Sequence, residues 1–285
     1  MSLEPTAVFL VLLSALMHAA WNLMAKMGPD RLISIAVITG ASAVMSVIVL
    51  LAVGLPAEPS WPYLIASCVS SLVYFFFLTR AYRGDLSVAY PVSRGVAPLL
   101  VLLVSAVWLR EAPSAIGLAG VLLISSSILI LAKQHGSAAG QNQTLLWAGG
   151  VGLTIAICTV VDGLGGRRSD NVIGYVAAQN ALMGSGVLAA ACLRRGGRAL
   201  AEGIRAHWRH GLLGGTLMLP SYVFVVYALS VSPMALVAAL RESSVVFAAI
   251  LGLIFLREPF GVRRIFASAV LATGIALLVL APHSY

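Results

Sequence analysis

Charged side chains are scarce in this sequence. Asp, Glu, Lys and Arg make up 10% of the 285 residues, whereas 60% are hydrophobic and the mean hydropathy is +0.99. A water-soluble domain of this length needs far more charge on its surface. The formal net charge is +8, yet no basic segment is interleaved with aromatic residues, so nucleic acid is not an expected partner. The composition excludes an ordinary soluble domain and indicates a lipid bilayer as the surroundings.

Cysteine is also rare, and catalytic patterns are missing. The three cysteines lie in apolar stretches without metal-ligand spacing: Cys68, Cys158 and Cys192. They are expected to be small buried residues rather than a disulfide framework. The sequence contains no His-Glu-x-x-His motif and no paired aspartates of the kind that membrane-embedded enzymes use. We therefore expect no enzymatic activity, no catalytic residue, no metal site and no cofactor.

Long apolar runs are abundant, and they do not alternate with polar residues. Runs of about 20 apolar residues are typical of membrane-spanning helices, whereas barrel strands alternate over about 10 residues. The sequence predicts an all-α integral membrane protein with ten transmembrane helices, at 4–25, 32–54, 61–80, 86–109, 114–132, 145–165, 171–193, 210–230, 233–256 and 261–281. Two connections are longer: a polar linker at 133–144, and an arginine-rich segment at 194–209 that is expected to form a surface helix.

The two halves of the chain resemble one another. A shift of 147 positions places Arg94 on Arg241 and Leu109-Arg110-Glu111 on Leu256-Arg257-Glu258. This similarity predicts a five-helix repeat at 1–132, a linker loop at 133–144 and a second five-helix repeat at 145–285. Because each repeat has an odd number of spans, the second would enter the membrane from the opposite side. Inverted repeats around a central cavity are typical of transporters that work by alternating access.

The turn that ends the fourth helix of each half resembles a known family. These turns are Trp108-Leu109-Arg110-Glu111-Ala112-Pro113 and Phe255-Leu256-Arg257-Glu258-Pro259-Phe260, each followed by a Gly/Ala-rich helix. Together with Pro91 and Pro98 they make the chain similar to the EamA family of the drug/metabolite transporter superfamily, over nearly its whole length. The segment from His18 to Lys26 resembles a bacterial subgroup associated with phosphonate utilisation. The resemblance implies ten helices around a central cavity and substrates that range over amino acids, other metabolites and toxic organic compounds.

The basic residues bear on orientation and on localisation, which we expect to be the bacterial inner membrane. Loops after odd-numbered helices carry 13 Lys and Arg, whereas the other loops and the termini carry three, Arg110, Arg167 and Arg168. The positive-inside rule then places both termini outside the cytoplasm. The family resemblance implies cytoplasmic termini, so orientation and transport direction stay open, as does the oligomeric state, for which a homodimer is one alternative.

Two arginines lie well inside predicted spans, where a charge costs at least about 2.5–3.5 kcal/mol on insertion scales. Arg94 and Arg241 occupy equivalent positions in the two halves. Guanidinium groups can bind a carboxylate or phosphonate through two oxygens. One hypothesis is that both arginines bind an anionic or zwitterionic substrate. The alternative is that each neutralises a helix-end carbonyl or a carboxylate such as Glu242 or Asp162.

Asp162 and Glu242 are candidates for proton coupling, and ion-pair structure is the alternative for each. His18 and Asn22 share a helix face, and with Trp21 and Tyr90 they are further candidates for substrate contact. Other polar groups, of which some are expected to line the cavity, are Tyr74, Tyr222, Tyr227, Gln179 and Asn180. Gly211 and Gly215 are expected to allow close helix packing. Glu111 and Glu258 are each expected to cap the helix that follows.

The functional prediction is a secondary transporter that moves a small polar metabolite, amino-acid-like, carboxylate or phosphonate, by alternating access. The alternative is an exporter of toxic organic compounds or drugs, proton-coupled through Asp162 or Glu242. The expected partners are a small-molecule substrate and the lipid bilayer.

Overall fold

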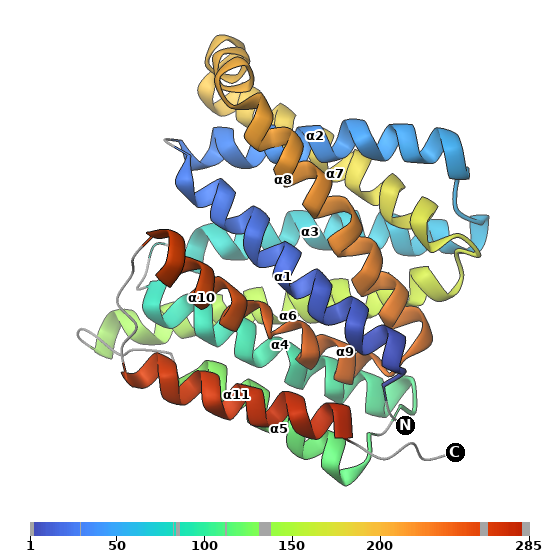
Figure 1. Cartoon of the computed structure of the whole chain (residues 1–285), viewed down its shortest axis with the longest axis vertical. Coiled ribbons are helices and arrows are strands. Elements are labelled where there is room, and N and C mark those ends of the chain that lie inside the picture. The colour runs from blue at the N-terminus through green and yellow to red at the C-terminus, as the bar shows by residue number, and fades with distance from the viewer. Residues whose placement is uncertain are drawn as a thin grey trace.

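The computed structural model describes residues 3–28, 30–81, 83, 86–111, 113–130, 138–256 and 262–280. Over these ranges the secondary structure is helical (Figure 1). The elements are α1 (Pro5–Met27), α2 (Arg31–Val53), the 3-10 turn η1 (Glu58–Ser60), α3 (Trp61–Ala81), α4 (Leu86–Trp108), α5 (Ala115–Ile130), α6 (Ala138–Arg167), α7 (Val172–Arg195), α8 (Gly197–Val231), α9 (Met234–Arg241), α10 (Ser244–Leu256) and α11 (Val262–Leu280). The turn that contains Arg257 and Glu258 lies outside the described residues.

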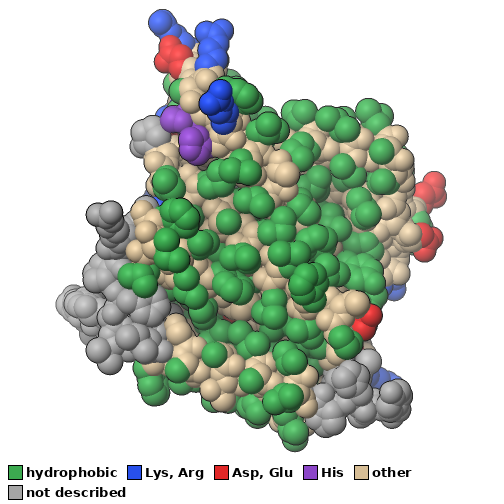
Figure 2. All heavy atoms as spheres, viewed as in Figure 1, with side chains coloured by type: hydrophobic (Ala, Val, Ile, Leu, Met, Phe, Trp, Pro, Cys, Tyr) green, Lys and Arg blue, Asp and Glu red, His purple; other side chains and the backbone are tan. Residues whose placement is uncertain are grey.

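Most of these helices are long and apolar enough to cross a bilayer. Within the described ranges there are eight candidate membrane spans, and two shorter apolar helices, Ala115–Ile130 and Phe266–Leu280, accompany them. Figure 2 shows hydrophobic side chains over most of one broad face, with charged groups gathered at its edges. Side chains of this kind are what lipid tails, rather than water, would cover.

The ten predicted helices all have a counterpart at the expected place, with three differences. α6 begins at Ala138, inside the segment expected to be a linker. The segment expected to form a separate surface helix is helical, but it is the first part of α8, which begins at Gly197 and continues through a kink at His207 (φ −122°, ψ 18°). The Ala, Leu and Arg residues ahead of the kink favour helix, while the charged residues among them make this segment too polar for a span. The third difference is a break in the ninth predicted helix at Glu242 and Ser243, which separates α9 from α10.

The packing of the helices repeats when the two halves are exchanged. α3 of the first half packs on α6, and its counterpart α8 packs on α1. Likewise α4 packs on α6, while its counterparts α9 and α10 pack on α1. The helices that correspond to each other also meet, α2 with α7 and α5 with α11. The halves are therefore intertwined, and the interior of the molecule is built from both.

Small residues let these helices approach closely. Gly211 and Gly215 of α8 lie against α2, where an added Cβ would come within 2.4 Å of Val37 Cγ1 and 2.8 Å of the Ser42 nitrogen, respectively. The expectation of close packing at both glycines is confirmed. Gly184 of α7 plays the same part on the other side of α2.

The end of the bundle that holds both termini is tied together across the halves. Glu111 does not cap the helix that follows it, contrary to expectation: Ser114 Oγ accepts the hydrogen bond from the Gly117 nitrogen instead. The Glu111 carboxylate accepts a hydrogen bond at 2.9 Å from the Met234 nitrogen, the first of α9, and forms a 2.6 Å ion pair with Arg167. The buried helix start of α9 offers unpaired N–H groups and a positive dipole end, which attract this carboxylate more strongly than the exposed start of α5.

Candidate functional site

A buried ion pair joins the two halves near the middle of the bundle. The Nε of Arg94 on α4 lies 3.0 Å from Oε2 of Glu242, in the break between α9 and α10. The Arg94 Nη2 also donates to Ser244 Oγ at 3.4 Å. Because the chain leaves the regular helix at Glu242, this side chain can turn toward α4 although its neighbour Arg241 points elsewhere. The break therefore gives the carboxylate a cation from the opposite half.

Arg241 has a different environment from its counterpart Arg94. Its guanidinium carbon lies 5.7 Å from the ring centroid of Tyr222 on α8, a cation–π contact. Among the residues that the structure describes, Arg241 makes no ion pair. Of the two equivalent arginines, Arg94 is therefore neutralised by a protein carboxylate, whereas the guanidinium of Arg241 has no carboxylate partner among the described residues.

Asp162 on α6 is fully buried and is surrounded by neutral donors. Tyr175 OH donates at 3.1 Å to Oδ1, and Gln179 Nε2 donates at 3.2 and 3.3 Å to the two carboxylate oxygens. Ser67 and Tyr222 complete the shell with hydroxyl hydrogen bonds. In the described part of the chain no cation lies within ion-pair distance of this carboxylate.

Tyr222 links the two clusters. Its hydroxyl donates to Asp162 Oδ2, while the face of its ring lies against Arg241. The Tyr222 hydroxyl can donate to a charged carboxylate or accept from a protonated one, so the phenol is sensitive to the charge state of Asp162. A proton on Asp162 and an anion at Arg241 would therefore act on the same side chain.

The candidate substrate-contact residues on α1 and α4 differ in whether they face this centre. His18 stacks edge-to-face on Trp21 at 5.1 Å, and both intramembrane arginines act on it electrostatically. Tyr90 is 44% exposed, one turn before Arg94. Asn22 points away from the cluster: its side chain is exposed and donates to the His18 carbonyl oxygen at 2.8 Å. The structure thus brings His18 toward the arginines, whereas the Asn22 amide is occupied by its own helix.

Several buried polar atoms around the centre lack partners. Within the described residues, Ser243 Oγ, Gln179 Oε1 and Asn180 Nδ2 are buried and have no hydrogen-bond partner. A buried polar group that is left unpaired costs about 1–3 kcal/mol. Ser243 lies in the break, two residues after Arg241. The two amides are neighbours on α7, where Gln179 also binds Asp162. Such atoms are expected where a polar ligand or water completes the hydrogen bonding.

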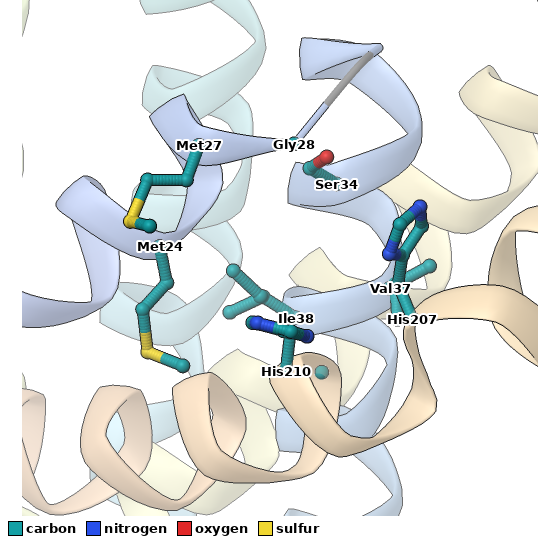
Figure 3. Close-up of a pocket in the computed structure, with 9 residues that line it drawn as sticks. Met24, Met27, Gly28, Ser34, Val37, Ile38, His207 and His210 are labelled. Carbon is teal, nitrogen blue, oxygen red and sulfur yellow. The ribbon is translucent and has the colours of Figure 1, made fainter.

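A separate cavity of about 140 Å³ lies between α1, α2 and α8, at the end of the bundle opposite the termini (Figure 3). Its lining residues are Met24, Met27, Gly28, Ser34, Val37, Ile38, His207, His210 and Gly211. In Figure 3 the two methionines on α1 lie across from the two histidines at the kink of α8. None of the candidate substrate-binding residues lines this cavity.

Metal binding finds no support in the described ranges, where no group of three or more His, Cys, Asp or Glu side chains is close enough to hold an ion. The chemistry of the centre is instead that of charge and hydrogen bonding. It contains one cation without a carboxylate partner, one carboxylate without a cation partner, and one neutralised pair.

Sequence reasoning found the four charged residues and gave pairing with Glu242 as an alternative role of the arginines, which is the contact that Arg94 makes. It did not indicate the partners of Asp162. Tyr175 and Ser67, which hold Asp162, carry no distinguishing signal in an apolar helix. The spacing of Tyr175 and Gln179 by four residues, which places both on one face of α7, is the only local indication of the shell. The ion pair between Glu111 and Arg167 was missed because it joins the ends of helices from different halves.

Comparison with known proteins agrees with this architecture. The model of the EamA-like transporter family matches residues 5–133 and again residues 143–280. No curated protein matches the sequence at a significant level. A solved structure titled "Crystal structure of protein" superposes with a TM-score of 0.75 over 97% of both chains at 16% identity, which shows a shared fold. The two successive family matches, which together cover nearly the whole sequence, show that the chain belongs to the EamA-like transporter family, a family of multi-pass membrane transporters.

Proposed function

We propose that the protein is a secondary transporter in which a small anionic or zwitterionic metabolite binds between the two halves, at Arg241. The observation that carries this proposal is the unequal environment of the two equivalent arginines. Arg94 is neutralised by Glu242 at 3.0 Å, whereas the Arg241 guanidinium faces only the Tyr222 ring among its described contacts. An intramembrane cation is costly, and a substrate carboxylate or phosphonate would neutralise it.

The proposed architecture is ten spans in two inverted five-helix repeats around the interior that holds Arg241. The exchange symmetry of the helix packing supports it, because α3 on α6 is matched by α8 on α1. The break between α9 and α10 also supports it. Broken helices near mid-membrane place helix ends and unpaired polar groups beside the substrate in transporters built from inverted repeats. Here the break supplies Ser243 Oγ and the start of α10.

Asp162 is the better of the two candidates for proton coupling. Glu242 already has a cation partner, so gaining and losing a proton there would break or restore a buried ion pair. Asp162 is held by neutral donors alone, which can hydrogen-bond either form of the carboxyl. Through Tyr222, protonation of Asp162 would act on Arg241 and on the bound anion.

Export of toxic organic compounds is the second candidate function, and Asp162 is the observation in its favour. An organic cation could bind as a counter-ion of this carboxylate. Arg241 opposes that candidate, because it would repel a cation in the same interior. The sign of the ligand's charge therefore distinguishes the two functions.

The test is the melting temperature of the purified protein with a panel of amino acids, carboxylates, phosphonates and organic cations. A ligand that binds only the folded state raises this temperature. We expect a shift with an anion or zwitterion, and an affinity weaker by about 30-fold or more in Arg241→Ala, since losing one partner of a buried charge pair costs roughly 2 kcal/mol or more.

Arg80→Ala is the matched control, because Arg80 also contacts aromatic rings, those of Phe76 and Trp147, but lies away from Asp162. The same ligand should shift this variant as it shifts the wild type. Shifts with organic cations alone, or a shift that Arg241→Ala leaves unchanged, would contradict the proposed site.

A further inference from the structure

The first part of α8 projects from the rest of the bundle and carries arginines at its tip. It runs from Gly197 to the kink at His207, and Figure 1 shows it extending beyond the other helices. Figure 2 shows Lys and Arg side chains gathered there, with the kink histidines just below them. The site proposed above does not use this segment, so the following inference does not depend on the substrate.

One face of this segment is fixed against the bundle. Gly203 packs on α2, where an added Cβ would lie 2.3 Å from Ile33 Cγ2. Leu200 on the same face is partly buried. The segment therefore has a defined inner side, which settles where its other residues point.

Its outer side is basic. Arg198 and Arg205 are seven residues apart, two helical turns, so they lie on one face opposite Gly203. Arg209 follows just after the kink, with its guanidinium carbon 5.4 Å from the Trp208 ring. All three arginines are exposed. The single carboxylate among them, Glu202, pairs with Arg198 at 3.0 Å, so it offsets one charge and leaves two.

Apolar residues flank this basic face. Ile204 is 41% exposed and Trp208 is 53% exposed, although both are large and hydrophobic. A helix with arginines on its polar side and Trp or Ile beside them suits the boundary between lipid headgroups and acyl chains. The neighbouring Arg195 is not part of this surface, because it binds Asp30 at 2.8 Å and thereby holds the pKa of that carboxyl below its ordinary range.

We propose that the surface formed by Arg198, Arg205 and Arg209, with Ile204 and Trp208 beside it, binds the headgroups of anionic phospholipids and so anchors α8 at the kink. Charge complementarity selects an anionic lipid rather than a neutral one. Because Gly203 packs on α2, a lipid that anchors this segment also holds α2 and the lining of the cavity beneath His207 in place. The positive-inside rule alone would explain why basic residues lie on this side of the membrane. It would not make the stability of the folded protein depend on the charge of the lipid.

The experiment is a titration of the full-length protein, in neutral detergent, with phosphatidylglycerol or phosphatidylcholine, with the melting temperature as readout. We expect phosphatidylglycerol to stabilise the protein at lower mole fraction than phosphatidylcholine. Each arginine replaced by Gln should weaken this lipid's binding by about five-fold, and the triple variant by about 100-fold. Added salt should weaken the effect, and inorganic phosphate should not reproduce it.

Three further variants keep the test decisive if the triple Gln variant folds poorly. The triple Lys variant should keep most of the response, and E202Q should strengthen it by freeing Arg198. R110Q, which removes an exposed arginine at the opposite end of the bundle, should leave the response unchanged. Two results would overturn the proposal outright: an equal response to both lipids, or a response that phosphate reproduces. A response that E202Q and the triple Gln variant leave unchanged would also overturn it, and would indicate that the surface binds an acidic protein instead.

Discussion

At the scale of single residues, the main feature is how the charges in the interior are distributed. Glu242 is 3% exposed and Asp162 is fully buried, yet only the former has a cation at ion-pair distance among the described residues. The buried pair of Arg94 and Glu242 can be removed as a unit at little cost, whereas removing one partner leaves an uncompensated charge. Asp162 needs no cation, because hydroxyl and amide donors satisfy its oxygens.

The first prediction concerns this pair. R94A should lower the free energy of unfolding by about 3–5 kcal/mol, because it leaves the Glu242 charge buried and unpaired. The double variant R94A/E242A should be more stable than R94A alone. Denaturant or thermal melts of the wild type, R94A, E242A and the double variant measure this coupling. If the two single effects simply add, the ion pair at 3.0 Å contributes nothing and Arg94 is held by other contacts.

At the scale of helices, packing depends on small residues at helix contacts and on how the polar groups at buried helix ends are paired. α7 meets α2 through Gly184, where a Cβ would lie 2.5 Å from the Thr39 carbonyl oxygen and 2.7 Å from Ala43 Cβ. Two residues on, Gly186 has nothing within 4 Å of the position that a Cβ would occupy. The two glycines thus share a helix and differ only in what they face.

The second prediction uses that difference. G184A should destabilise the protein by about 1–3 kcal/mol, because α2 and α7 must move apart to admit the methyl group. G186A should leave the stability unchanged or raise it slightly, since Ala is favoured over Gly within a helix. Melting temperatures of the pair in the same detergent give the answer. Equal effects would mean that α2 and α7 do not pack as closely as described.

The third prediction concerns the end of the bundle that holds the termini. Glu111 joins the start of α9 to Arg167 at the end of α6. E111Q keeps an acceptor for the Met234 nitrogen but removes the charge that holds Arg167, so it should loosen this end with little loss of helix capping. E111A removes both and should cost about 1–3 kcal/mol.

Labelling of a cysteine introduced at Ser230, a partly buried position near the end of α8, measures the opening. We expect a faster reaction in E111Q than in the parent, and an unchanged rate in the control R110Q, which alters an exposed arginine one residue away. An identical rate in E111Q and the parent would show that this ion pair does not hold the bundle closed.

At the scale of the whole molecule, apolar length was enough to predict the order of the helices, because that signal is local. Helix ends agree within a few residues except at Ala138, where polar sequence continues as helix, and at Gly197, where the expected surface helix is continuous with the span. The break at Glu242 was not predicted, since Arg241, Glu242 and Ser243 sit in an otherwise apolar run. The break turns Glu242 toward Arg94 in the other half, a partner that no window along the chain can indicate.

The same limit applies to the candidate site. The repeat identified Arg94 and Arg241 as equivalent, but it could not show that one is neutralised and the other is not. Of the three basic residues on the terminal side, the structure pairs Arg167 with Glu111 and places Arg168 against Tyr63. The positive-inside rule counts Lys and Arg rather than net charge, so these contacts leave the orientation open.

The central claim is that an anionic or zwitterionic metabolite crosses the membrane by way of Arg241 with a proton carried at Asp162. The most direct measurement is uptake of the ligand identified by thermal shift into proteoliposomes, with and without an imposed pH gradient. We predict gradient-dependent uptake by the wild type, none by R241A, and uptake by D162N that no longer responds to the gradient but still exchanges ligand. Uptake that neither substitution alters would contradict the account.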